Sequence, residues 1–97
     1  MKTASGKVIK AIRQHLGYTQ NFVADKLNIT TATLANIENG RVSIDLEKLY
    51  QLCLLFKLPM RIMIQLIYEI HEKGSDEGLA NAVKQLINTQ TDEDGVE

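Results

Sequence analysis

The sequence predicts an all-α protein of six helices, and three observations carry that prediction. Apolar residues recur at spacings of three and four almost throughout the 97-residue chain, and no stretch alternates apolar and polar residues as a strand does. Residues that end helices (glycine, asparagine and proline) fall between these apolar runs. The length and a hydrophobic content of 44% are enough for one domain with a core of its own.

Each expected helix has its own start or stop signal. Side chains that cap helix N-termini precede the second, third and fourth helices. Residues that tolerate left-handed backbone angles follow the first, second, third and fifth helices. The start signals are Thr19, Thr30 or Thr31, and Asp45, and the stop signals are Gly17, Asn28, Asn39-Gly40 and Gly74, with Pro59 between the fourth and fifth helices.

The apolar residues of each run mark the side expected to face the core. In the second helix this inner face includes Phe22 and Val23, and in the fourth helix it includes Leu46 and Tyr50. The single cysteine, Cys53, falls on the same apolar face of the fourth helix, so we interpret it as a small buried hydrophobe. One cysteine excludes an intramolecular disulfide and indicates a reducing compartment.

The fifth helix, residues 60–73, is apolar on most of its circumference. Between residues 60 and 70 only Arg61, Gln65 and Glu69 interrupt the apolar residues. Such a helix is buried on more than one side, and it is too short to span a membrane. It is either a central core helix or a helix that packs on its own domain and on a second copy, and the small number of covering helices favours the second. The expected dimer interface comprises Met60, Met63, Ile64, Ile67 and Tyr68.

The last part of the chain divides into two segments. Residues 74–90 have apolar residues at helical spacing after an acidic start, which predicts an amphipathic helix from Ser75 to Gln90. Residues 91–97 are acidic with few apolar side chains, and we expect a disordered tail there. The predicted boundaries are therefore 1–73, 74–90 and 91–97.

The charges are unevenly distributed along the chain. The total is −1, but residues 1–41 hold six basic and two acidic residues, whereas residues 42–97 hold five basic and ten acidic ones. A near-neutral total is usually read as evidence against binding to nucleic acid. The division into a basic and an acidic half instead indicates that the first half faces an anionic partner.

Residues 18–41 carry a helix-turn-helix pattern, which is two short helices joined by a short turn. Gln20 opens the second helix after a threonine, Ala24 stands four residues later, and residues 37–41 read Ile-Glu-Asn-Gly-Arg. On these residues the chain resembles the lambda-repressor-like, Cro-type helix-turn-helix (XRE) family, over roughly residues 8–66. The resemblance implies a five-helix lambda-repressor-like DNA-binding domain, to which this chain adds a C-terminal amphipathic helix.

The resemblance also implies roles for the matched residues. Ala24 is the small contact where the two helices cross. Gln20, at a helix N-terminus, is placed to reach a DNA phosphate beside free backbone N–H groups. Arg13 pairs with Glu38, which ties the first helix to the end of the third.

The recognition helix has short side chains at the positions that the family turns outward. These are Thr31, Ala32, Thr33 and Asn36, with Thr30 at the helix start. None is Arg, Lys or Gln, but asparagine can pair with adenine, and threonine and alanine can contact a thymine methyl group. We expect a readout biased toward A·T pairs and dependent on DNA shape. The alternative is that this surface no longer binds DNA and serves as a scaffold for protein contacts.

Further basic and polar residues are expected to contact the DNA backbone. The family places phosphate contacts just past the recognition helix, at Asn39 and Arg41. Lys7 and Lys10 belong to the basic half of the chain and add candidates for backbone affinity.

The sequence does not support catalysis. His15 and His71 lie far apart and show no ligand spacing for a metal, and no glycine-rich phosphate loop occurs. We therefore expect no enzyme, no cofactor and no metal.

The expected function is that of a sequence-specific DNA-binding regulator of transcription, and more specifically a repressor. It would act as a homodimer on a pseudo-palindromic operator of double-stranded DNA. The alternative is an antitoxin-type protein-interaction module that also binds DNA and engages a protein partner through residues 75–97. The N-terminal residues lack the apolar segment of an export signal, so a cytoplasmic protein without membrane contact is expected.

Overall fold

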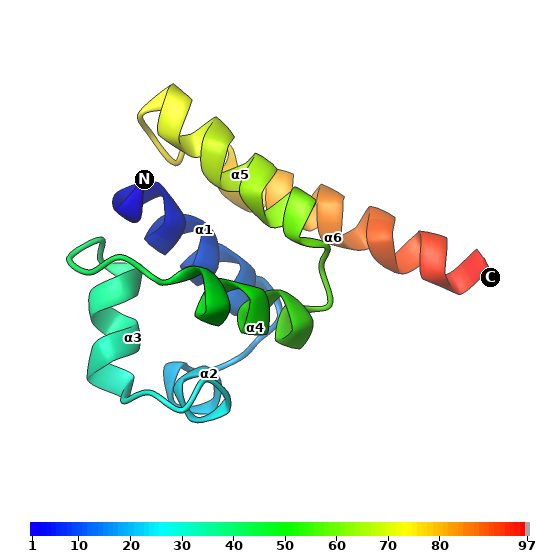
Figure 1. The fold of residues 1–97 in the computed structure, drawn as a ribbon. Coiled ribbons are helices and arrows are strands. Elements are labelled where there is room, and N and C mark those ends of the chain that lie inside the picture. The colour runs from blue at the N-terminus through cyan, green and yellow to red at the C-terminus, as the bar shows by residue number, and fades with distance from the viewer. Residues whose placement is uncertain (97) are drawn as a thin grey trace.

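The computed structural model describes residues 1–96, and the side chains of residues 1–87. In this part of the chain every regular element is an α-helix, as the sequence predicts (Figure 1). The helices are α1 (Lys2–His15), α2 (Gln20–Lys26), α3 (Thr31–Glu38), α4 (Leu46–Phe56), α5 (Met60–Lys73) and α6 (Leu79–Val96).

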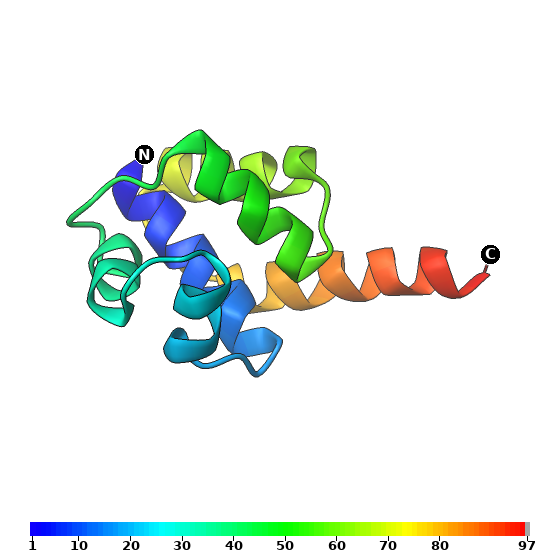
Figure 2. The ribbon, with the colours of Figure 1, turned by 60° about the horizontal axis from the view of Figure 1, so that its bottom comes forward.

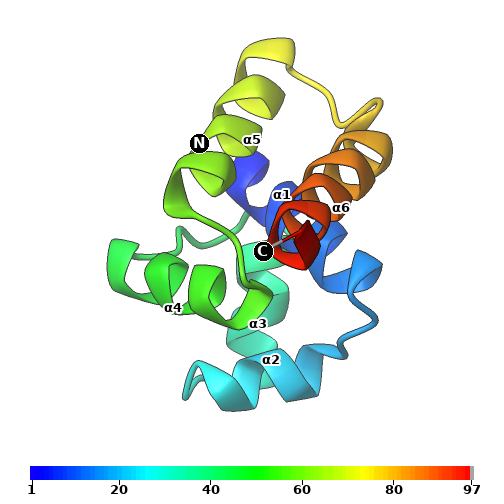
Figure 3. The same cartoon turned by 90° about the vertical axis from the view of Figure 1, so that its right-hand side faces the viewer.

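The central helix of the fold is α1. It packs against α3, α5 and α6, and the views in Figures 1 and 3 show it enclosed between them. Its Val8, Ile9 and Ile12 are completely buried. The alternative that the 60–73 helix is the central core helix is therefore wrong, because α1 holds that position and α5 covers one of its sides.

The predicted N-terminal caps of α2, α3 and α4 are confirmed. The Thr19 hydroxyl accepts a hydrogen bond from the backbone N–H of Phe22 at 3.0 Å, and the Asp45 carboxylate accepts one from Lys48 at 2.8 Å. Of the two candidate threonines, Thr30 is the cap and Thr31 is the first residue of α3, and the Thr30 hydroxyl accepts from the N–H of Thr33 at 3.0 Å. Each cap satisfies a backbone donor that the helix itself leaves without a partner.

Residues with a left-handed backbone conformation (positive φ) follow several of the helices. Asn28, in the turn between α2 and α3, has a φ of 60°, which asparagine adopts more readily than most residues. Lys57, which follows α4, has a φ of 59°, a conformation that a lysine at this position did not predict. Lysine at such a position is strained, because its Cβ approaches the backbone.

Three apolar residues that we expected on inner faces are exposed. Phe22 is 40% exposed, Tyr50 49% and Leu46 69%. Phe22 packs beside the ring of Tyr18, with the ring centroids 4.9 Å apart, instead of entering the core. Val23 of α2 and Leu49, Leu52, Cys53 and Phe56 of α4 are buried as predicted, whereas Leu54 is 60% exposed.

The helix α5 has the predicted bounds, but its outer face is smaller than expected. Met63 and Ile67 are buried in the protomer's own core, at 0% and 4% exposure, so neither is available to a second copy. Ile64 and Tyr68 are 46% and 54% exposed, and Met60 is half-buried. The error arose because periodicity alone does not tell which apolar residues of an almost wholly apolar helix turn inward.

The C-terminal helix begins later and ends later than predicted. Residues 75–78 form a loop rather than a first turn, because Gly74 before the loop and Gly78 at its end both have positive φ. The helix then continues through residues 91–96, where we expected a disordered tail, and no proline interrupts it. It runs along α1 and extends past the other helices (Figure 2). Its buried Leu79, Val83 and Ile87 join the common core, so α6 packs on its own chain over this stretch.

The cysteine lies in this core. Cys53 is 2% exposed, and burial raises the pKa of its thiol to about 11, because a thiolate loses its hydration there. Its Sγ lies 3.3 Å from Sδ of Met60, which joins α4 to the start of α5. None of the helices in the described part of the chain is both long and apolar enough to cross a bilayer.

Candidate DNA-binding site

The helices α2 and α3 form the predicted helix-turn-helix unit. Ala24 is 2% exposed where the two helices meet, which fits the small contact expected there. Its carbonyl oxygen accepts a hydrogen bond from the N–H of Ile29 at 3.0 Å, and this bond closes the turn around Asn28. The turn thus fixes the angle at which α3 leaves α2.

The helix α3 separates its side chains into an inner and an outer face. Leu34 and Ile37 are buried against α1 and α2, whereas Thr31 and Ala32 are exposed. Thr33 and Asn36, the other outward positions named from the sequence, are only half-exposed. The N-terminal turn of α3 is therefore its most accessible part, which is the part that helix-turn-helix proteins place against base edges.

Hydrogen bonds hold the threonines of this first turn. The hydroxyls of Thr30 and Thr33 lie 2.9 Å apart, and the Thr31 hydroxyl donates to Oδ1 of Asn21 at 2.6 Å. Asn21 was not named from the sequence, although it follows Gln20 at the N-terminus of α2. Asn21 is exposed, and its side-chain amide adds a donor beside the first turn of α3.

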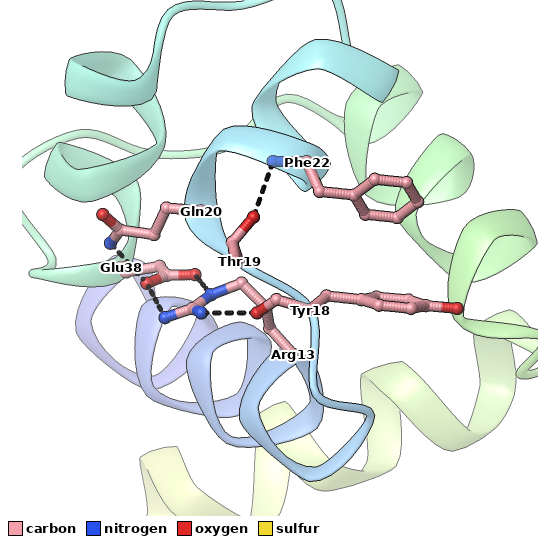
Figure 4. Close-up of polar contacts among 6 residues, drawn as sticks. All are labelled: Arg13, Tyr18, Thr19, Gln20, Phe22 and Glu38. Carbon is pink, nitrogen blue, oxygen red and sulfur yellow. Dashed lines mark hydrogen bonds and ion pairs between the residues drawn. The ribbon is translucent and has the colours of Figure 1, made fainter.

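The Arg13–Glu38 ion pair is confirmed. Arg13 Nε donates to Glu38 Oε2 at 2.7 Å, and Nη2 donates to Oε1 at 3.1 Å (Figure 4). Arg13 Nη1 also donates to the carbonyl oxygen of Tyr18 at 2.8 Å. Both charged side chains are buried, and every buried side-chain polar atom in the described part of the chain has a hydrogen-bond partner. The pair therefore joins α1, the α1–α2 turn and the end of α3 rather than facing DNA.

Gln20 takes part in the same network. Its amide nitrogen donates to Oε1 of Glu38 at 2.9 Å, a contact that the sequence did not predict (Figure 4). The amide has two N–H groups, so one is engaged with Glu38 and the other remains for a phosphate. Gln20 thus links the start of α2 to the end of α3.

A close approach between α1 and α3 depends on Gly6, which the sequence analysis missed. Gly6 is buried, and a Cβ built at this position would lie within 2.7 Å of the Glu38 carbonyl oxygen and still closer to that of Ile37. Only glycine fits this crossing without a shift of one helix. An isolated glycine within a helical pattern was the available signal.

The loop after α3 is held by the carbonyl oxygen of Asn36. This oxygen accepts the N–H of Arg41 at 2.9 Å and that of Val42 at 3.4 Å. The Arg41 side chain is exposed, and no carboxylate of the described residues forms an ion pair with it. Arg41 is therefore free to meet a phosphate next to the recognition helix.

Lys7 and Lys10 lie apart from the α3 face. Together with Asn39 they line a surface hollow of about 530 Å³ between α1, the end of α3 and the start of α6. Asp76 lines the same hollow and reduces its positive charge. The predicted site residues therefore form two groups, one at the N-terminus of α3 and one around Asn39.

Comparison with known proteins identifies the family. A family model described as helix-turn-helix matches residues 9–62, which is more than half of the chain. The HTH-type transcriptional regulator ImmR of Bacillus subtilis (strain 168) is 32% identical over 89 residues, which cover 92% of this chain and 69% of that protein.

A solved structure has the same fold. The clp gene regulator ClgR from Corynebacterium glutamicum superposes with a TM-score of 0.69 at 19% sequence identity, over 87% of this chain and 90% of that one. Geometry, family model and relative agree with the resemblance found in residues 18–41. The chain belongs to the lambda-repressor-like, Cro-type (XRE) helix-turn-helix family of transcriptional regulators.

Proposed function

We propose that this chain is a sequence-specific regulator of transcription that binds duplex DNA as a homodimer and represses by occupying a pseudo-palindromic operator. The observation that carries the proposal is the exposed first turn of α3, with Thr31 and Ala32 accessible and held in place by the caps and by Asn21. We propose a cytoplasmic protein. The first turn of α3 would enter the major groove of the DNA, with Arg41 contacting the neighbouring phosphates.

A homodimer agrees with the size of the protomer. One helix-turn-helix unit makes few base contacts, and two units on a two-fold site read half-sites about 34 Å apart. The protomer measures 38 × 30 × 21 Å, so its dimensions are of the same order as this half-site spacing.

The antitoxin-type alternative predicts that residues 75–97 fold only on a second protein. Leu79, Val83 and Ile87 are buried within the protomer, which means that this stretch of α6 needs no partner to cover its apolar side. This burial favours the regulator.

Selection of bound DNA from a random duplex pool tests the proposal directly. A palindromic consensus is expected, with A·T pairs where α3 enters the groove. Affinity for the selected duplex is expected to fall along a straight line of log K against log salt concentration. An absence of measurable binding at low salt would overturn the proposal.

Two substitutions test the assignment of roles within the site. We expect Asn36→Ala to relax the sequence preference at one or two base pairs. The binding free energy that favours the preferred base there is expected to fall by about 1–3 kcal/mol. Arg41→Ala is expected to weaken binding to all sequences alike and to reduce the salt slope by about 1. Fluorescence anisotropy on the selected duplex and on single-base variants measures both effects, and the reverse pattern would refute the assignment.

A further inference from the structure

Large exposed apolar side chains gather on one side of the molecule. Among the described residues eight such side chains are exposed, and six of them come from α4, α5 and the chain start. These six are Met1, Leu46, Tyr50, Leu54, Ile64 and Tyr68. The two helices share the side that faces the viewer in Figure 1 and lies on the left in Figure 3. A concentration of this kind marks an interaction surface rather than scattered surface hydrophobes.

The residues of each helix form a stripe. On α4, Leu46, Tyr50 and Leu54 follow one another at intervals of four residues, and on α5 Met60 is followed at the same interval by Ile64 and Tyr68. Residues four apart lie on one side of a helix, so each set is a continuous line. The helices α4 and α5 contact each other, and Cys53 Sγ lies 3.3 Å from Met60 Sδ beneath the exposed side chains. An apolar hollow beside the second line is lined by Met1, Met60, Ile64 and Tyr68.

The α5 line alone is too small for a stable dimer. Stable interfaces bury about 800 Å² on each partner, and somewhat more than half of that, about 450 Å², is apolar. Ile64 and Tyr68 are each about half-exposed, so together they offer on the order of 200 Å². The exposed parts of Leu46, Tyr50 and Leu54 add on the order of 300 Å². The α4 stripe thus more than doubles the apolar area available.

The polar residues of this surface suit a second copy of the same chain. Arg61 and Lys57 lie at the α4–α5 junction, whereas Glu47 lies at the start of α4 and Glu69 on the outer part of α5. A two-fold contact repeats the same patch on both partners, so a patch of mixed sign can pair its cations with the partner's carboxylates. A patch of one sign would repel its own copy.

We propose that the second copy docks on a composite face of α4 and α5, formed by Leu46, Tyr50, Leu54, Met60, Ile64 and Tyr68, and not on α5 alone. The inference rests on the homodimer of the proposed function. The helices α4 and α5 lie beside the α2–α3 unit rather than across it (Figure 3), so we expect a partner seated on them to leave the first turn of α3 uncovered.

The experiment compares one carboxylate placed at three exposed positions of the full chain. Leu54→Glu changes the α4 stripe and Ile64→Glu changes the α5 stripe. The control is Ala80→Glu, an exposed position on α6, the helix that lies to the right of α4 and α5 in Figure 3. Sedimentation equilibrium over a range of concentrations measures the dissociation constant of the dimer. Thermal unfolding by circular dichroism confirms that each variant is folded.

We expect Leu54→Glu and Ile64→Glu each to raise the dissociation constant at least tenfold, and Ala80→Glu to leave it within about twofold. A dimer weakened by Ile64→Glu but not by Leu54→Glu would confine the interface to α5 and overturn this inference, with the homodimer intact. A dimer that neither substitution weakens would place the interface elsewhere, and it would also overturn this inference with the homodimer intact. A wild-type chain that stays monomeric and occupies half-sites singly would refute the homodimer itself, and with it this inference.

Discussion

Two regions of the molecule reverse the usual placement of side chains in opposite ways. At the junction of α1 and α3, the charged side chains of Arg13 and Glu38 are buried with every polar atom bonded. On the composite face, Leu46, Tyr50 and Tyr68 are about half or more exposed, and none of the described helices covers them. A buried charge lowers stability unless it is paired and hydrogen-bonded. Exposed apolar surface lowers it unless another surface covers it.

The two regions differ in where their side chains find partners. The buried charges find their partners within the chain, so this junction fixes the geometry of the DNA-binding unit before any DNA arrives. The exposed apolar side chains find no cover within the protomer, so this face is available to a second copy. One region holds the helix-turn-helix unit together, and the other is the face on which we propose that a second copy docks.

Ile67→Glu tests where α5 divides between core and composite face. Ile67 is 4% exposed, so a carboxylate there loses its hydration, and we expect a loss of at least about 4 kcal/mol in the free energy of unfolding. Urea unfolding followed by circular dichroism measures the loss. The matched variant Ile64→Glu, three residues away on the exposed side, is expected to change the free energy of unfolding of the protomer by less than about 1 kcal/mol. A folded and stable Ile67→Glu monomer would mean that Ile67 belongs to the dimer surface.

Glu38→Ala removes the acceptor that the α1–α3 junction shares. Arg13 then keeps a buried charge without its carboxylate, and the Gln20 amide loses its partner. We expect a loss of about 3–5 kcal/mol by urea unfolding, as for other buried pairs broken from one side. Lys48→Ala is the control, because it removes a surface pair with Asp45 at 3.8 Å and is expected to cost less than about 1 kcal/mol. Equal losses for both variants would show that burial of the Arg13–Glu38 pair has no special weight.

The sequence predicted which segments form helices better than it predicted which side of each helix is buried. Caps such as Thr30 and Asp45 are local, because a side chain bonds to a backbone three residues away, and each predicted helix start that depends on such a cap is confirmed. Which side of α4 or α5 is buried depends on where α1 lies, which is a property of the whole fold. For that reason Leu46 and Tyr50 were expected inside and Met63 at a dimer interface.

The site divides in the same way. The Arg13–Glu38 pair was predicted because the family pattern carries it. The contacts of Asn21 with Thr31 and of Gln20 with Glu38 join residues 10 and 18 positions apart, and no spacing rule connects them.

Gly6→Ala tests whether the α1–α3 junction depends on close contact as well as on charge. Alanine usually favours a helix over glycine by about 1 kcal/mol, but here the added Cβ meets the carbonyl oxygens of Ile37 and Glu38. We expect the contact to dominate and the variant to lose about 1–3 kcal/mol by urea unfolding. Its affinity for the selected duplex is also expected to fall, because the end of α3 must shift. A gain in stability with unchanged DNA affinity would show that the two helices separate freely at this point.

Lys57→Gly acts at the junction of the two helices that form the composite face. Lys57 holds a left-handed backbone with a φ of 59°, which costs a residue with a Cβ roughly 1–2 kcal/mol relative to glycine. Glycine also loses more chain entropy on folding, so we expect a net gain of about 0.5–1 kcal/mol by urea unfolding. The matched control is Lys57→Ala, which removes the same charge but keeps the Cβ and should give no such gain. Equal effects of glycine and alanine would trace the gain to the lost lysine side chain rather than to the left-handed backbone.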